Sequence, residues 1–360
     1  KLHVDDELIE ATSGGLRALL KSLSVKGALA GKFKLVAAQG HEPAAAPDLF
    51  WDGQLWFNDI AFTAGLEVSQ STGTLGIRGR HNGRQLLGVH GNLLLESATL
   101  LKQPLRDAHV GLLVDEERPD LLLLNVKAPL HGGDVTGQIA LNCGPSLRYD
   151  LNLTASQIDL ERFGRHNMGA KSQIKGVGNA RLVLKGEGAD LGTLDGSGTI
   201  DIPSGGHILN IPLLLDLLKF LGLRWPDRTF FDEAHAGFTV RGPRVHATRL
   251  ELLGSAISLY GRGEFNLDGS DLALDLYPSW ARVEQLLPPA VRAVPPAITK
   301  NLLIIEMRGK VGSEPGDIVF HKKALPILVD PFLQMRDRIS ATPTVGAGPS
   351  VTTPMPRRLD

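Results

Sequence analysis

Residues 256–267 read Ala-Ile-Ser-Leu-Tyr-Gly-Arg-Gly-Glu-Phe-Asn-Leu, and this stretch decides the fold class. The apolar side chains and the glycines share one parity: Ile257, Leu259, Gly261, Gly263, Phe265 and Leu267. The residues between them are mostly polar. Because successive side chains of a β-strand point to opposite faces, this alternation predicts a strand with one apolar and one polar face.

The same alternation recurs along most of the chain. Further strands are expected at residues 55–62, 74–80, 121–126, 135–141, 147–153, 180–184, 198–202, 238–241, 272–276 and 317–320. Turn signals such as His81-Asn82-Gly83, Gly242-Pro243 and Asp268-Gly269 separate neighbouring stretches. Strands that follow one another with turns between them predict an antiparallel meander, and the fold class is mainly β.

The composition agrees with a long sheet rather than an enzyme core. The 360 residues include 41 glycines but only 5% aromatic residues, and 38 basic side chains balance 39 acidic ones. Large catalytic pockets use more aromatic area, and nucleic-acid binders carry a basic excess, so we expect neither class. The single cysteine, Cys143, excludes an intrachain disulfide and a zinc site built on cysteines.

An internal repeat supports the same architecture. Residues 91–105 match residues 198–213, and residues 107–114 match residues 233–240. The second copy carries an extra apolar stretch at residues 214–231. We therefore expect one β unit used twice, at about 91–141 and 198–267, within a sheet that covers residues 24–340.

Helices are expected only at the ends and in the insertion. Residues 1–23 are interpreted as an N-terminal helix or linker that follows an anchor missing from this sequence, and residues 341–360 as a disordered tail rich in Pro and Thr. Short helices are expected at residues 281–287 and 325–339. An apolar helix at residues 213–221 either completes the core or caps a hydrophobic groove, with the cap formed by Leu214, Leu217, Leu218 and Leu221.

No catalytic or metal-binding pattern emerges from the sequence. The eleven histidines show no metal-ligand spacing, and His109 and His235 occupy equivalent repeat positions, as scaffold residues do. Nucleophile elbows, phosphate loops and CxxC motifs are absent from the sequence. We expect a protein that is not an enzyme and needs no cofactor.

The order of several blocks resembles the C-terminal region of AsmA-like proteins, a family related to bridge-like lipid transporters. The blocks are residues 194–206 (Leu-Asp-Gly-Ser-Gly-Thr-Ile-Asp-Ile-Pro-Ser-Gly-Gly), Ile211-Pro-Leu-Leu before a Leu-rich stretch, Phe231-Asp-Glu-Ala, residues 257–269, and Met307-Arg-Gly-Lys-Val-Gly. The resemblance covers roughly residues 74–339. It implies an elongated antiparallel sheet folded into a taco-like hydrophobic groove, with a few short helices capping it.

The resemblance also implies a function. Such a protein faces the periplasm, is anchored in the inner membrane, and carries phospholipid or other acyl chains between the inner and outer membranes. Its partners are then those lipids and membranes and no nucleic acid. The alternative is an assembly factor that pairs exposed strand edges with outer-membrane proteins by β-strand augmentation. About 20 strands at ~4.8 Å would reach roughly 90 Å, too short to span an envelope alone.

The residues expected to line the groove are Leu93, Leu95, Ile139, Leu141, Ile200, Ile202, Ile257, Leu259, Phe265, Leu267, Leu272 and Leu274. They share the apolar parity of their strands. An ordinary closed sandwich core would use the same parity, so this second interpretation stays open at the level of sequence.

Overall fold

The structure is a computed structural model. It describes residues 2–4, 6–11, 17, 20–21, 24–38, 48–63, 67–82, 86–100, 103–143, 146–168, 173–205, 207–209, 231–254, 257–280, 303–310 and 318–324. The expected helices at residues 213–221, 281–287 and 325–339 and the expected tail at 341–360 lie outside the described residues. The gate residues Leu214, Leu217, Leu218 and Leu221 lie outside them as well.

The described chain is mainly β, as the alternation predicted. The strands of the first half are β1 (Leu2–Val4), β2 (Lys26–Ala38), β3 (Asp48–Thr63), β4 (Glu67–His81), β5 (Leu86–Leu100), β6 (Gln103–Val114), β7 (Leu121–Leu130), β8 (Gly133–Cys143) and β9 (Leu147–Asp159). The strands of the second half are β10 (Gln173–Lys175), β11 (Val177–Glu187), β12 (Asp190–Ile202), β13 (His207–Leu209), β14 (Glu233–Arg241), β15 (Arg244–Leu253), β16 (Ile257–Asn266), β17 (Leu272–Trp280), β18 (Leu303–Gly309) and β19 (Val319–Ala324). The helices are α1 (Asp6–Ala11) and α3 (Leu160–Met168).

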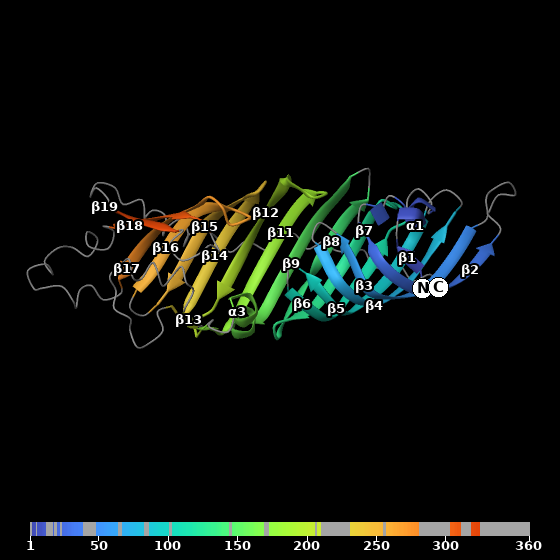
Figure 1. The fold of residues 1–360 in the computed structure, drawn as a ribbon, viewed down its shortest axis with the longest axis horizontal. Coiled ribbons are helices and arrows are strands. Elements are labelled where there is room, and N and C mark those ends of the chain that lie inside the picture. Colours follow the sequence, from blue (N-terminus) through green and yellow to red (C-terminus); the bar gives the residue numbers. More distant parts are fainter. Residues whose placement is uncertain are drawn as a thin grey trace, which may run out of the picture.

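Seventeen of these strands form one antiparallel sheet, and β10 pairs with β13 in a separate two-stranded sheet. Within the large sheet each strand pairs with the one that precedes it and the one that follows it, from β1 through β9, β11, β12 and β14 to β19. The chain therefore runs along the sheet from one end to the other, as the continuous colour gradient of Figure 1 shows. The sheet is open, which excludes the closed sandwich as a description of the large sheet.

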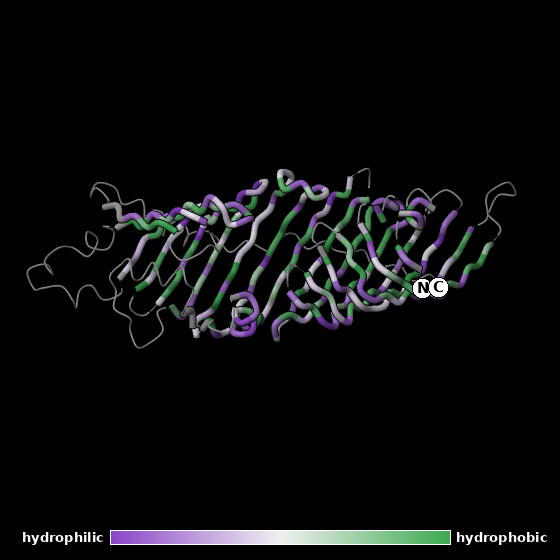
Figure 2. Tube along the Cα trace, in the orientation of Figure 1, coloured by the Kyte–Doolittle hydropathy of each residue, from purple (hydrophilic) through white to green (hydrophobic). Residues whose placement is uncertain are grey.

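The sheet is folded lengthwise into a taco, so one face is turned inward. Figure 2 shows hydrophobic and hydrophilic residues alternating along the strands. Inward side chains of neighbouring strands pack into buried clusters. One cluster runs through neighbouring strands from Val89 of β5 and Leu141 of β8, by way of Leu151 of β9 and Leu194 of β12, to Val240 and Val245 of β14 and β15. A second cluster, around Ile257, Ile305 and Met307, lies in the C-terminal half of the sheet.

A row of irregular residues accompanies the fold of the N-terminal half. The non-glycine residues Asp59, Gln70, Asp107 and Gln157 all have φ between 53° and 56°. The register of β5 and β6 continues unbroken across Asp107, whereas Asp59, Gln70 and Gln157 each lie at a register shift where two residues of their own strand oppose one residue of the partner. Because a bulge bends its strand and increases the local twist, these positions curve the sheet along one line of strand ends.

The N-terminal segment differs from the expectation. Leu2–Val4 is a strand paired with β2, not part of a helix or linker, and α1 ends at Ala11 instead of running to residue 23. Arg17, Leu20 and Lys21 are helical again. The helix α3 was not anticipated at all, because residues 160–168 follow directly on a strand and are polar over most of their length.

The two copies of the repeat have the same strand register. Gly91 lies opposite Leu112 in β5 and β6, and the matching Gly198 lies opposite Phe238 in β12 and β14. Likewise, Leu95 faces Ala108 and Ile202 faces Ala234. The sequence match therefore corresponds to the same pair of strands built twice.

Candidate functional site: the inner face of the folded sheet

The inward residues form an apolar surface that is continuous across the sheet. One row of directly opposed residues, here called the inner row, can be followed through sixteen strands from β2 to β19. Its members are Gly31, Leu55, Leu75, Leu93, Val110, Val126, Gly137, Leu153, Leu182, Gly198, Phe238, Ala247, Gly263, Leu274, Met307 and Phe320. Every member is apolar or glycine, so a path along the inner row meets no polar side chain.

The opposite, outward face of the sheet is polar. The positions next to the inner row on the outward parity include Gln54, Asn92, Asn125, Gln138 and Asn152, and Gln138 donates a hydrogen bond to Asn125 at 3.0 Å. The Lys185–Asp195 and Arg244–Glu264 ion pairs also lie between outward residues of adjacent strands. Water therefore solvates one face of the sheet, and the other face is shielded by the fold.

Glycines opposite aromatic residues allow the aromatic rings to lie flat on the inner face. Register places Phe33 opposite Gly53, Trp51 opposite Gly79 and Phe238 opposite Gly198. A Cβ added at Gly79 would lie only 2.6 Å from Cζ2 of Trp51, and one at Gly198 would overlap the ring of Phe238. Each ring therefore lies across its glycine, along the sheet, instead of projecting into the space between the walls.

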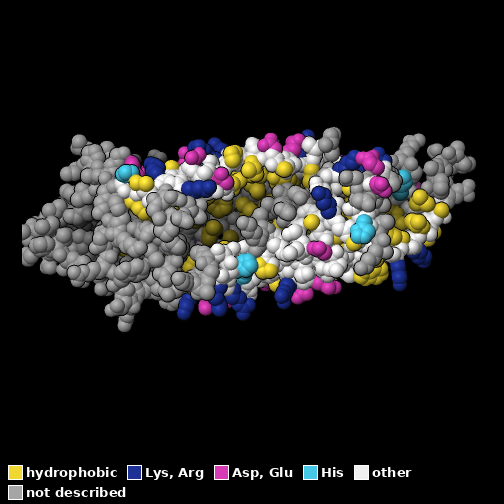
Figure 3. Space-filling view, in the orientation of Figure 1, with side chains coloured by type: hydrophobic (Ala, Val, Ile, Leu, Met, Phe, Trp, Pro, Cys, Tyr) yellow, Lys and Arg dark blue, Asp and Glu magenta, His cyan; other side chains and the backbone are white. Residues whose placement is uncertain are grey.

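Part of the inner face is left uncovered by the side chains that the structure describes. Ile200 belongs to the inward parity of β12, yet 44% of its surface is exposed. The residues directly opposite it, Ala180 and Ala236, are small and only half-buried. Figure 3 shows a hollow lined by hydrophobic side chains between rims that carry charged ones. The inner face thus forms a groove with apolar walls.

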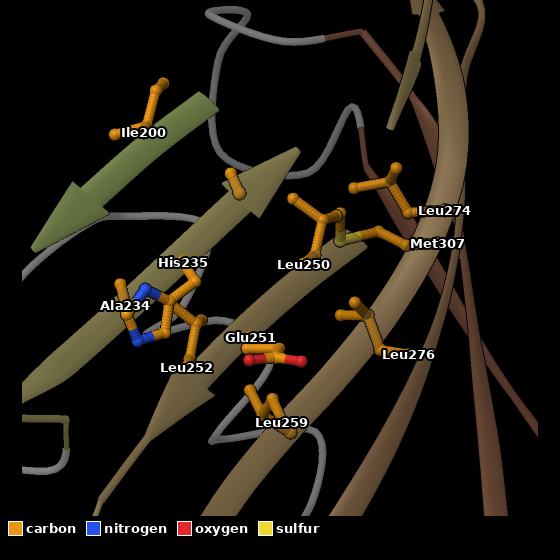
Figure 4. Close-up of a pocket in the computed structure, with 11 residues that line it drawn as sticks. Ile200, Ala234, His235, Leu250, Glu251, Leu252, Leu259, Leu274, Leu276 and Met307 are labelled. Atoms are coloured by element: carbon orange, nitrogen blue, oxygen red, sulfur yellow. The ribbon is translucent and has the colours of Figure 1, made fainter. Parts of the chain in front are cut away.

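The groove deepens into a cavity of about 170 Å³ in the C-terminal half. Its walls come from β12 and from the strands β14 to β18: Ile200, Ala234, His235, Ala236, Leu250, Glu251, Leu252, Leu259, Leu274, Leu276 and Met307. In Figure 4 the side chains of Leu250, Leu274 and Met307 converge on one side of the opening. Nine of the eleven lining residues are apolar, so this cavity accepts hydrocarbon and disfavours a polar ligand.

The structure places most of the predicted lining residues on the inward parity, but not in equivalent surroundings. Ile200 and the half-buried Leu93, Ile139, Ile202 and Phe265 border the groove or pack beside the buried clusters. In contrast, Leu95, Leu141, Ile257, Leu259, Leu272 and Leu274 are buried in those clusters. Leu267 follows the last residue of β16, is 47% exposed, and does not belong to the inner face.

Sequence reasoning missed the contribution of the N-terminal strands. Leu55, Leu75 and Trp51 carry the inner face through β3 and β4, outside the repeat on which the prediction was based. The strict alternation of residues 74–80 was a usable signal, since Leu75 and Ile77 share the parity of the groove.

His235 occupies the outer face behind the cavity. Its Nδ1 lies 2.9 Å from Oδ1 of Asp201, and its Nε2 lies 2.7 Å from Oε1 of Glu233. Partial burial acts to lower the pKa of His235, but the two carboxylates outweigh burial and hold the pKa above its ordinary value. Its repeat counterpart His109 faces Leu94 and Lys127, so the two histidines have different partners. Among the described residues, no group of three or more His, Cys, Asp or Glu side chains is arranged to hold a metal ion.

The helix α3 bridges several strand ends at one rim of the groove. Asp159 caps it by accepting hydrogen bonds from the backbone N–H groups of Glu161, at 2.9 Å, and Arg162, at 3.1 Å. At its other end, Asn167 accepts a hydrogen bond from Gln103 of β6 at 2.6 Å. Nine helical residues span about 13 Å, and the three strand spacings from β9 to β6 span about 14 Å, so α3 matches the distance that it bridges.

Comparison with known proteins gives no relative: no protein-family model, no curated protein and no solved structure matches this chain. In the described part of the chain, neither helix has the length and apolar character needed to cross a bilayer.

Proposed function

We propose that the protein binds the acyl chains of phospholipids, or of similar lipids, along the inner face of its folded sheet. The inner row carries this proposal, because it offers an apolar path across sixteen strands with a polar surface outside. An acyl chain needs a surface that excludes water and little else. Burying each methylene group is worth about 0.8 kcal/mol, so ten buried methylenes would contribute about 8 kcal/mol.

The groove fits the role expected of an AsmA-like protein of the periplasm that passes lipids between the inner and outer membranes. The open ends of the sheet support passage along the groove rather than storage in a closed cavity.

The experiment compares two adjacent exposed residues of β12 that point to opposite faces. Ile200→Glu puts a carboxylate into the groove, and Thr199→Glu puts the same group on the outer face. Each protein is purified from a bacterial host without detergent, and bound lipid is measured by native mass spectrometry and by solvent extraction. We expect the wild type and Thr199→Glu to retain lipid. Ile200→Glu should carry at least tenfold less bound lipid than the wild type.

A folded wild-type protein without lipid would contradict the proposal, and so would equal lipid content in the two variants. Circular dichroism of all three proteins controls for unfolding. Both positions are exposed, so we expect the sheet to form in each variant.

A further inference from the structure

Two hollows adjoin each other on the outward face of the sheet, opposite the groove. One hollow of about 470 Å³ crosses the strands β3 to β7, and another of about 240 Å³ crosses β7 to β9. Asn125 of β7 belongs to the walls of both. The two hollows therefore form one depression, here called the outer trough, across the blue to green strands of Figure 1.

One line of directly opposed positions in the outer trough consists of amides and glycines. Its members from β4 to β9 are Gly76, Asn92, Gly111, Asn125, Gln138 and Asn152. The four amide side chains are exposed. The 3.0 Å hydrogen bond from Gln138 to Asn125 holds two of them side by side, and it does not use the NH₂ group of Asn125 or the carbonyl oxygen of Gln138. This line can therefore offer donors and acceptors to a ligand without carrying a charge.

The neighbouring line of positions is apolar in the middle and charged at its ends. Leu113, Leu123 and Ala140 are directly opposed on β6, β7 and β8, and all three are half-buried. The charged or titratable members are Asp52, Arg78 and His90 at one end and Asp150 at the other. The outer trough thus places a polar edge beside an apolar floor, and its charges are of both signs.

The two glycines of the outer trough are not required by the packing of the sheet. Within 4 Å, a Cβ added at Gly76 would meet only the backbone oxygen of Asn92, at 4.0 Å, and one at Gly111 would meet only Cβ of Asn125, at 3.8 Å. Neither glycine has a positive φ, so alanine would fit at both positions. Glycine weakens the interior of a strand, and it often marks a place where a ligand approaches the backbone closely. Gly76 and Gly111 therefore favour a ligand that lies directly on the strands.

We propose that the outer trough binds a neutral, extended glycan. A sugar ring has an apolar face and polar edges, which match the floor of Leu113, Leu123 and Ala140 and the adjoining line of amides. Neighbouring strands lie about 4.8 Å apart, close to the repeat of one ring in an extended β-linked chain, so successive strands can contact successive rings. This site uses the face opposite the groove and goes beyond the proposed lipid-binding function.

Two other classes of ligand fit the outer trough less well. A peptide strand joins a sheet through open backbone groups, whereas β4 to β8 are paired with a strand on both sides where they form the trough. A nucleic acid or another polyanion would lie against the carboxylates of Asp52 and Asp150.

The test uses the full chain and isothermal titration calorimetry with chitohexaose, an uncharged β-linked hexamer of N-acetylglucosamine. Maltohexaose, an α-linked hexamer of glucose, is the comparison ligand. We expect the wild type to bind chitohexaose at least tenfold more tightly, because the α-linked chain curves and cannot follow a straight line of strands.

Gly111→Val closes the outer trough. The new Cβ meets no atom closer than 3.8 Å, so we expect a melting temperature close to that of the wild type and at least tenfold weaker binding of chitohexaose. Gly237→Val is the matched control. Gly237 is also an outward, half-buried glycine, but it lies on β14 outside the trough, and its added Cβ would come no closer than 3.5 Å to another atom. This variant should bind chitohexaose as the wild type does.

Asn125→Ala tests the line of amides without adding volume. We expect at least fivefold weaker binding of chitohexaose, because Asn125 belongs to both hollows. Lys127→Ala is its control, since Lys127 is the next outward residue of β7, is exposed, and belongs to neither hollow. This second pair of variants decides the question even if Gly111→Val does not fold.

The proposal is overturned if folded wild-type protein binds neither hexamer, or if it binds both with equal affinity. It is also overturned if Asn125→Ala, or a folded Gly111→Val, binds chitohexaose as tightly as the wild type. Tighter binding of a heparin hexasaccharide than of chitohexaose would likewise contradict a site for neutral glycans. Since none of these assays measures lipid in the groove, failure here leaves the proposed lipid-binding function standing.

Discussion

At the scale of single residues, glycine does more in this protein than make turns. Gly53, Gly79 and Gly198 stand opposite aromatic residues on the inner face and allow each ring to lie along the sheet. An alanine at such a position would lift the ring into the groove or displace the backbone. The high glycine content is therefore explained in part by the need for apolar walls that are broad and thin.

Gly198→Ala tests this explanation. An added Cβ would overlap the Phe238 ring and approach the backbone oxygen of Arg181 at 2.8 Å, so we expect a loss of about 1–3 kcal/mol in the free energy of unfolding. Gly76→Ala is the control, because its Cβ would meet nothing closer than the backbone oxygen of Asn92 at 4.0 Å. Urea unfolding measures both variants. Equal stabilities would show that the Phe238 ring does not rest on Gly198.

At the scale of elements, α3 is held to the rim by a small cluster around His131. Nε2 of His131 lies 2.8 Å from Oε1 of Gln103, and the His131 ring meets Phe163 edge-on with ring centres 5.8 Å apart. The His166 ring of α3 is 5.7 Å away. Burial lowers the pKa of His131, and the nearby His166 and Arg162 lower it further, against the opposing effect of Asp159.

The position of α3 should consequently depend on pH. A histidine whose pKa is lower in the folded state disfavours folding once it is protonated, so stability is lost as the pH falls from about 6.5 towards the lowered value. We expect the hydrogen-exchange protection factors of α3 to be smaller at pH 5.5 than at pH 7.5. In His131→Asn, which keeps an amide near Gln103 but cannot titrate, this dependence should disappear. If it persists there, another group, such as His166, is responsible.

The alternation of residues 256–267 and of similar stretches predicted many of the strands and the apolar face, because a strand with one solvated face alternates polar and apolar residues. The strands β2, β15 and β18 were not among those expected. The repeat predicted one β unit used twice, and the shared register of the two copies came only from the structure. The alternation did not predict that Phe238 lies on Gly198, since that pairing depends on which strands become neighbours. It also did not predict α3, although Asp159 ahead of Leu160 is an available capping signal.

The extent of the groove was likewise beyond what the sequence could specify. Ile200 and Leu141 have the same parity and similar chemistry, yet one is 44% exposed and the other 1%. The difference arises from the surroundings: Leu141 packs in a buried cluster of leucines, valines and Tyr149, whereas Ile200 lies opposite the small residues Ala180 and Ala236. The alternation within one strand does not show which side chains of other strands will cover a given residue.

At the scale of the whole molecule, each strand of the sheet pairs only with the strands next to it along the chain. In the described part of the large sheet, interior strands depend on two sequence neighbours, whereas β19 depends on one. Elongated proteins of this kind open from their ends and need not unfold in one step. The largest buried cluster opposes this tendency in the middle, because its inward residues follow one another across the strands from β5 to β15.

Truncation of two equally buried residues can show whether the end of the sheet opens independently of the middle. Met307 in β18 and Leu141 in β8 are each 1% exposed, and truncation of either to alanine should cost about 2–5 kcal/mol locally. We expect Met307→Ala to speed hydrogen exchange in β17 and β18 and to leave β5 to β9 unchanged. Leu141→Ala should speed exchange in β5 to β9 and also in the strands up to β15, because its cluster continues through β9 and β12 to β14 and β15. If both variants accelerate exchange uniformly along the sheet, the protein unfolds as one cooperative unit and the groove cannot open from one end alone.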